Sequence, residues 1–318
     1  MLAAARRHIG GGGVLGGLRK GLSAVHSRAI PLVLNLRGHL RLARALASPE
    51  LAGLRQRHPR IEYKYLSRYL ASHLSTSARL AILTHHLERM RARAIPGFLG
   101  DIFDEGSMLW EETRDDHRFG IALSYPHSFF LEGVELDAEG DLSLVFHVDG
   151  APASFLSFTL APGRMVGAPD DEVLFVGIVQ GVWGRGDAIK AAEHTLRYTP
   201  ALLLLVAAQA IALSLGATAV VGVSARAQLS SAEAGFRFAY DELWRSCGAE
   251  SLDGWTYRLP VPFPEKPIET IKRDHRPRVR RKRAFKHSVA EHVRFQFASR
   301  FLRPELHCHP ERSEGSRS

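Results

Sequence analysis

The most apolar segment of the chain sets the first constraint on its fold. Residues 201–215 are almost all Ala, Leu, Ile and Val, with Gln209 inside the run. A helix needs about 20 residues to cross a bilayer, and this segment has 15. We therefore expect a helix that is buried on all sides within a domain. At 318 residues and 45% hydrophobic content, the chain is long enough to build such a core.

Cysteine usage and the first residues give further limits. Neither Cys247 nor Cys308 belongs to a C-x-x-C motif, so the sequence predicts no disulfide framework and no zinc site. Residues 1–21 lack the apolar stretch of a secretory signal. The expected location is therefore cytoplasmic. Residues 1–29 combine glycine clusters with basic and no acidic residues, and this predicts a mobile basic arm.

A helical period governs residues 30–97. Ser75 is a candidate N-cap for the helix that follows it, and Pro96-Gly97 ends the pattern. The apolar residues recur at steps of three and four, as in Leu32, Leu34, Leu40, Leu42, Leu46, Tyr65, Leu66, Tyr69, Leu70, Leu74, Leu80, Ile82, Leu83 and Leu87.

After residue 98 the period changes to that of strands. Four short β-branched or aromatic segments separated by Asp and Gly predict an antiparallel meander, at residues 118–124, 133–136, 142–148 and 153–160. More uniformly apolar segments, a strand at residues 172–179 and another at 217–223, predict the centre of the sheet. A helix at residues 236–247 and a strand at 254–259 follow.

The expected fold class is therefore α+β: a helical N-terminal region, then a mixed, mostly antiparallel sheet with flanking helices. We place the core domain at residues 98–293. Residues 294–318 are assigned to a disordered tail, because the end of the chain is polar and without period.

Several separated motifs occur in a characteristic order along the chain. They are Tyr63-Lys64-Tyr65-Leu66, Phe155-Leu156-Ser157-Phe158-Thr159, Gly177-Ile178-Val179-Gln180-Gly181, Arg197 with Pro200, Tyr240-Asp241-Glu242-Leu243-Trp244, Leu259-Pro260 and Arg281-Lys282-Arg283-Ala284. Together they resemble the VirK/YbjX family of bacterial proteins. That resemblance implies a link to virulence, to envelope remodelling and to tolerance of antimicrobial peptides, and it brings no catalytic residues. The chain departs from the family at His86, where tyrosine usually follows the histidine at His85.

The order of elements over residues 172–247 is also similar to the core of GNAT acyltransferases. In that fold, a Q-x-x-G-x-G loop at a helix N-terminus binds the pyrophosphate of acyl-coenzyme A. Gln180, Gly184 and Gly186 give Q-x-x-x-G-x-G, which is one residue longer, and Arg185 would add a positive charge. The resemblance also implies that Tyr240 is a general acid toward the coenzyme thiolate.

Each of these residues has an alternative interpretation without chemistry. The glycines could only form a turn, and Tyr240 could be one of the apolar residues of a packed helix, together with Phe236 and Trp244. A metal site is not predicted, because only His85 and Glu88 share a helix face.

Acidic and basic clusters complete the candidates. Glu132, Asp137, Glu139 and Asp141 could supply a general base, although turns are rich in acids anyway. The basic segment at residues 272–286 would attract anionic lipid or a partner, and it lacks any motif for specific nucleic-acid recognition.

Two hypotheses follow for the function. In the first, the protein is an acyl-CoA-dependent acyltransferase that modifies an envelope precursor. In the second, it is a noncatalytic envelope-associated factor, peripheral to the inner membrane, that binds anionic lipid or a partner through residues 272–286.

Overall fold

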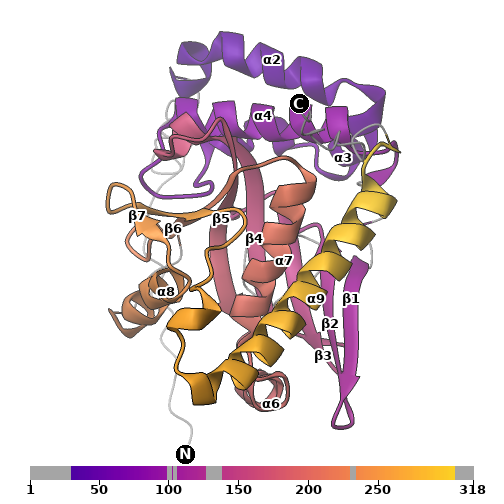
Figure 1. Cartoon of the computed structure of the whole chain (residues 1–318). Helices are drawn as coiled ribbons and strands as arrows, with labels where there is room; N and C mark the ends of the chain where they lie inside the picture. Colours follow the sequence, from indigo (N-terminus) through magenta and orange to yellow (C-terminus); the bar gives the residue numbers. More distant parts are fainter. Residues whose placement is uncertain (1–29, 99–101, 103–105, 127–137, 230–233, 305–318) are drawn as a thin grey trace, which may run out of the picture.

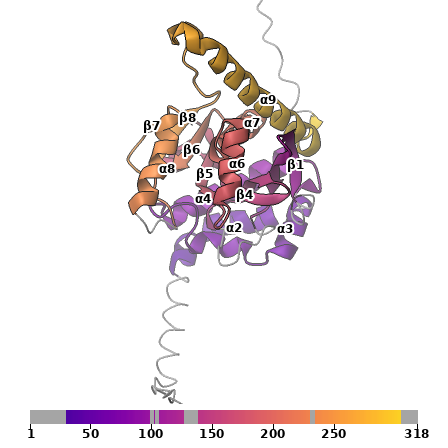
Figure 2. The ribbon, with the colours of Figure 1, turned by 90° about the horizontal axis from the view of Figure 1, so that it is seen from below.

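The computed structural model describes residues 30–98, 102, 106–126, 138–229 and 234–304, with the side chains of residues 234–239 left out. The elements form three layers around one sheet. Figure 2 shows α2, α3 and α4 on one side of the strands and α7 with α9 on the other. The mobile arm predicted at residues 1–29 lies outside the described residues.

The N-terminal helical region packs on the sheet through one long helix. Ser75 caps this helix as predicted, since its hydroxyl accepts a hydrogen bond from the Ala78 N–H at 3.2 Å. His86 fixes the helix to the sheet, because its Nδ1 accepts from the Leu160 N–H at 3.2 Å. The elements are α2 (Leu36–Leu46), η1 (Pro49–Leu51), α3 (Ala52–Arg57), η2 (Ile61–Leu66) and α4 (Thr76–Arg93).

The sheet has the order β1-β2-β3-β4-β5-β6-β8-β7. The antiparallel meander is confirmed over β2, β3 and β4, and β5 lies in the centre as predicted. β1, which the sequence did not predict, pairs antiparallel with β2 at the edge. The strand expected at residues 133–136 lies outside the described residues. The strands are β1 (Ser107–Arg114), β2 (His117–Ser124), β3 (Leu142–Val148), β4 (Ala151–Pro162), β5 (Glu172–Gly181), β6 (Ala219–Val223), β7 (Glu250–Ser251) and β8 (Thr256–Pro260).

The crossover from β5 to β6 contains the helix that the apolar run predicts. It consists of α6 (Gly186–Leu196) and α7 (Pro200–Ser214). Thr199 caps α7 by accepting from the Leu202 N–H at 3.2 Å, and α7 is buried between the sheet and the last helix. Among the described residues no single helix is both long and apolar enough to cross a membrane; α6 and α7 reach that length only as a pair bent by 71°.

The last part of the chain returns over α7. α8 (Ala234–Ser246) precedes the β7–β8 ribbon, and the turns η5 (Ile268–Thr270) and η6 (Arg273–His275) then lead into α9 (Arg276–Phe301). Earlier in the chain, the turn η4 (Gly163–Val166) follows β4. Figure 1 shows α9 running alongside α7 across the sheet toward β1.

One boundary expected from the sequence needs correction. Residues 294–301, assigned there to a disordered tail, form the last two turns of α9. Phe297 and Phe301 are buried, and the Phe301 ring meets Phe98 edge-on at 5.2 Å. The end of α4 and the end of α9 are also joined, because a β-bridge links Ala94 to Leu302. Burial of these rings explains why the helix continues.

Candidate functional site

The sheet opens where β5 and β6 diverge. These strands form the parallel pair, and their pairing runs from Val173 with Ala219 to Val176 with Gly222. β5 continues to Gly181 while β6 ends at Val223. Past the last pair, the edge of β5 that faces β6 has no strand partner within the described part of the chain. Backbone groups at such an edge are available to a ligand.

A bulge in β5 marks the start of this opening. The register between β4 and β5 shifts at Gly177, and a Cβ on Gly177 would lie 2.0 Å from the backbone carbonyl of Glu139. Only glycine fits there. The close approach is to the backbone of Glu139, a residue that is 3% exposed. The charge of Glu139 also acts on the Tyr240 phenol, so its carboxyl group lies near this end of β5.

Tyr240 reaches this opening from α8. The residue is 4% exposed. Burial raises the pKa of the Tyr240 phenol well above its usual value and the charge of Glu139 raises it further, whereas Gln228, Trp244 and the backbone of Val179 act in the opposite direction. These influences place the phenol near the unpaired end of β5. The phenol is therefore protonated at neutral pH.

Two further polar side chains are buried beside Tyr240. Both amide atoms of Gln228 and the Nε1 of Trp244 are buried, and both side chains act on the Tyr240 hydroxyl through hydrogen bonding. The Trp244 ring covers Gly222, where a Cβ would lie 1.9 Å from Cζ2. Buried polar groups gathered in this way can also bind a polar ligand. No motif in the sequence points to Gln228.

The glycine loop after β5 forms a tight turn. The Arg185 N–H donates to the Val182 carbonyl at 3.1 Å, and Gly184 has a φ of 77°, as the third residue of a β-turn often requires. Gly186 begins α6 with open space around its Cα and an ordinary φ. No side chain among the described residues caps α6, so its first N–H groups point outward next to Arg185.

A segment of the N-terminal region closes the far side of the opening. The Leu70 N–H donates to the Ala138 carbonyl at 2.6 Å, and the Ser72 N–H donates to the Ala227 carbonyl at 2.8 Å. This segment therefore bridges the chain before β3 and the chain after β6. The helical N-terminal region is an integral wall of the site.

Comparison with known proteins decides the family. Residues 30–294 match the family described as "Protein of unknown function (DUF535)". The chain belongs to this family. DUF535 and VirK/YbjX are the same family, so the resemblance found in the sequence is confirmed. No curated protein matches.

Solved structures give a distant likeness only. Two variants of a cAMP-binding acyltransferase from Mycobacterium smegmatis are 13% identical to this DUF535 chain, with TM-scores of 0.28 and 0.27. The matches cover 70% and 69% of this chain. The chain spans only 63% and 60% of the length of those structures.

The first DUF535 motif supplies a cation to a buried carboxylate. The Lys64 Nζ donates to Asp141 Oδ1 at 2.8 Å, and the hydroxyls of Tyr69 and Thr159 both donate to Oδ2, the latter at 2.8 Å. Although burial acts to raise it, the charge of Lys64 holds the pKa of Asp141 below its usual value. Asp141 is thus an anchor of the fold, and its role as a general base is not supported by this geometry.

His85 belongs to a second buried network of the DUF535 core. Its Nε2 lies 2.6 Å from Glu172 Oε2, Arg89 Nε lies 2.8 Å from the same oxygen, and Arg93 pairs with Oε1. Burial opposes ionisation, yet hydrogen bonds from His85 and Arg93 lower the pKa of Glu172 to about 2. Glu88 faces away and binds Arg41, so His85 and Glu88 do not converge.

The structure describes only some of the remaining candidate residues. Glu132 and Asp137 lie outside the described residues. Cys247 is free, and burial raises the pKa of its thiol, which disfavours a reactive thiolate. Within the described residues, no group of three or more His, Cys, Asp or Glu side chains could hold a metal. Of the two acids weighed as general bases that the structure describes, Glu139 and Asp141, Glu139 is the one that acts electrostatically on Tyr240.

Proposed function

We propose that this DUF535 protein is an acyl-CoA-dependent acyltransferase whose site is the opening between β5 and β6. One observation supports the proposal: the Tyr240 phenol lies with the buried Gln228 amide near Val179, at the end of β5 that extends past β6. The pantetheine arm of coenzyme A is an extended chain with two amides, so it can pair with a strand edge and with a buried amide. The buried amide of Gln228 fits such a ligand.

The loop from Gln180 to Gly186 would hold the phosphates of the cofactor. The free N–H groups at the start of α6 carry about half a positive charge, and the Arg185 guanidinium adds a full charge. Asp187 in the first turn acts against an anion, but it lies 3.8 Å from Lys190 and is fully exposed, so solvent screens it. Gly184 serves this loop by allowing the turn that aims Arg185 outward.

When bound, an acyl-coenzyme A supplies an activated acyl group and a thiolate leaving group. Tyr240 donates its phenolic proton to that sulfur as the carbon–sulfur bond breaks, which its raised pKa permits at neutral pH. Glu139 accepts the proton that the acceptor's amine or hydroxyl loses as its nitrogen or oxygen bonds to the acyl carbon. Transfer of this proton from Glu139 to the Tyr240 phenolate restores both groups, so the proton balance closes.

The acceptor is proposed to be an envelope precursor. Support comes from family membership, because the VirK/YbjX resemblance links such proteins to envelope remodelling and antimicrobial-peptide tolerance. In this proposal the acyl transfer takes place on the cytoplasmic side, on a precursor that is later exported.

Ligand binding is tested first, by thermal shift with coenzyme A, acetyl-coenzyme A and a long-chain acyl-coenzyme A. A ligand at a hundredfold excess over its Kd stabilises the folded state by about 2.7 kcal/mol. We expect this shift to weaken in Arg185→Ala and to persist in Lys190→Ala, which removes an equally exposed charge from the same helix. Equal shifts in all three proteins would show that the loop does not bind the phosphates.

Turnover is then measured as thiol release from the acyl-coenzyme A that binds, with an envelope extract as the source of acceptor. Tyr240→Phe should slow release by about 10²-fold or more while leaving the thermal shift in place, since it removes only the proton donor. Wild-type turnover in this variant would exclude Tyr240 as the general acid.

A further inference from the structure

A cleft of about 650 Å³ lies between α2, α4 and η4, at the opposite end of the molecule from α6 (Figure 1). It plays no part in the proposed acyl transfer. Gly38 brings α2 against α4 beside it, since a Cβ there would lie 2.7 Å from the Leu80 side chain. The two helices separate toward the start of α2, and η4 forms the third wall.

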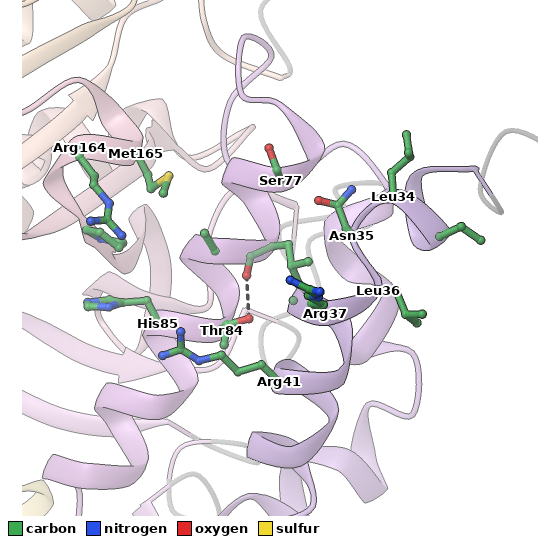
Figure 3. A pocket seen from close by; sticks show the side chains of 15 residues that line it. Leu34, Asn35, Leu36, Arg37, Arg41, Ser77, Thr84, His85, Arg164 and Met165 are labelled. Carbon is green, nitrogen blue, oxygen red and sulfur yellow. Dashed lines mark hydrogen bonds between the residues drawn. The ribbon is translucent and has the colours of Figure 1, made fainter.

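The cleft is lined by cations and, among its described lining residues, by no carboxylate. Figure 3 shows the side chains of Arg37, Arg41, Arg164 and His85 around the same space. Arg41 is held by Glu88, and His85 is held by Glu172. Arg37 and Arg164 are exposed and make no ion pair within the described part of the chain. Two uncompensated guanidinium groups therefore face one cleft, as a phosphate requires.

Beside the cleft lies the largest group of exposed apolar side chains in the described structure. Five large apolar residues within a span of eleven positions are each about half exposed or more, whereas most of the core residues are fully buried. Such a cluster next to basic side chains is typical of helices that lie in a membrane interface. The five are Ile30 (50%), Val33 (69%), Leu34 (79%), Leu36 (49%) and Leu40 (47%).

The charge of the cleft selects among the possible occupants of this surface. Residues 1–29 contain basic and no acidic side chains, so electrostatic repulsion disfavours that segment as a cover for Arg37 and Arg164. A second copy of the chain would present the same cationic cleft. An anionic bilayer offers both an apolar phase for the leucines and phosphates for the arginines.

We propose that the α2 surface, defined as residues 30–41 with Arg164, docks on an anionic lipid bilayer. The apolar side chains enter the interface, and the cleft takes a lipid phosphate between Arg37 and Arg164. This site is distinct from the basic residues of α9, where the sequence placed lipid contact. Two lipid-binding surfaces at different places can be separated by charge removal at each.

The test is flotation of the full-length protein with two kinds of vesicle. One is phosphatidylcholine alone, and the other is phosphatidylcholine with about 30% phosphatidylglycerol. Two matched double variants each remove two exposed arginines: Arg37→Gln with Arg164→Gln, and Arg278→Gln with Arg280→Gln on α9. Leu34→Ser with Leu36→Ser removes apolar contact at constant charge. Circular dichroism confirms that each variant is folded.

We expect the wild type to bind only the anionic vesicles. Loss of Arg37 and Arg164 should lower the partition coefficient about thirtyfold, which corresponds to about 2 kcal/mol for two basic residues at an anionic surface. The leucine variant should also lose binding, and the α9 variant should retain it. Binding should fall as salt rises from about 0.1 M to about 0.5 M.

Four results would overturn the proposal. Equal losses in the two arginine variants would show a response to net charge alone. Equal binding to neutral and anionic vesicles would show that the cleft binds no lipid phosphate. Unchanged binding in the leucine variant would show that the apolar side chains do not insert into the bilayer. Displacement of the protein from vesicles by inorganic phosphate at matched ionic strength would identify the cleft as a site for free phosphate.

Discussion

His86 offers a quantitative test of how α4 is held on the sheet. The ring is 2% exposed, and its Nδ1 must be unprotonated to accept the hydrogen bond from the Leu160 N–H. Burial lowers the pKa of His86 from 6.5 to about 4; Lys64 and His85 lower it further, whereas Asp141 and Glu172 raise it. The folded protein therefore binds this proton more weakly than the unfolded chain does.

The sign and size of the pH effect follow from these two pKa values. Above pH 6.5 His86 is neutral in both states, and the stability that it contributes is fully present. As pH falls, the unfolded chain takes up the proton first, so stability is lost between pH 6.5 and about 4. From pH 7.5 to 5 the loss is about 2 kcal/mol at ~1.36 kcal/mol per pKa unit. Glu172 and Asp141, whose pKa values are lowered, titrate below this window.

The measurement is urea unfolding of the wild type and of His86→Asn at pH 7.5 and pH 5. Asparagine keeps an acceptor near the position of Nδ1 and does not titrate. The stability that the variant loses through poorer packing is therefore the same at both pH values. The gap in unfolding free energy between the two proteins should narrow by about 2 kcal/mol at the lower pH. His73 and His147, whose pKa values burial also lowers, cancel in this difference.

An unchanged gap would refute the reasoning, because it would mean that His86 carries no shifted proton equilibrium. A variant that fails to fold leaves a second route. Titration of the His86 ring by NMR in the wild type should then give a pKa below 5, and a value near 6.5 would contradict the prediction.

Two further substitutions test the packing around the site. Lys64→Met leaves Asp141 buried without its cation and should lower the free energy of unfolding in urea by about 3–5 kcal/mol. A decrease below about 1 kcal/mol would show that Tyr69 and water replace the lysine. Gly222→Ala drives a methyl into the Trp244 ring and should lower stability by about 2 kcal/mol or more, whereas Gly53→Ala in open space on α3 should raise it by up to about 1 kcal/mol. Equal melting temperatures for the two alanine variants would contradict the close contact.

Local signals predicted much of the fold. Thr199-Pro200 opens α7 because a hydroxyl cap and a proline suit a helix start, and the apolar composition of α7 required burial on all sides. Uniformly apolar β5 had to be central. β1 was missed because its second half, residues 111–114, is a polar run, and the helix of α9 was hidden by its run of arginine and lysine.

The site was only partly accessible from sequence. The glycine loop and Tyr240 were proposed from the order of elements around them, and Tyr240 lies near Val179 at the end of β5. The buried partners could not be found, because no local pattern links residues that lie far apart in the sequence. Tyr69 and Asp141 are separated by 72 positions, and Arg93 and Glu172 by 79. Gln228 has no motif around it and is identified by its burial alone.

The junction between the ends of α4 and α9 has a consequence for folding during synthesis. Arg303 reaches back to the carbonyl of Ala94, a residue 209 positions earlier, and the Ile95 N–H donates to the Phe301 carbonyl at 2.9 Å. At about 5–20 residues per second, ~200 residues take on the order of 10–40 s to translate. Throughout that time Ala94 and Ile95 lack the partners that the end of α9 later supplies. This junction should therefore form only after synthesis of α9 is complete.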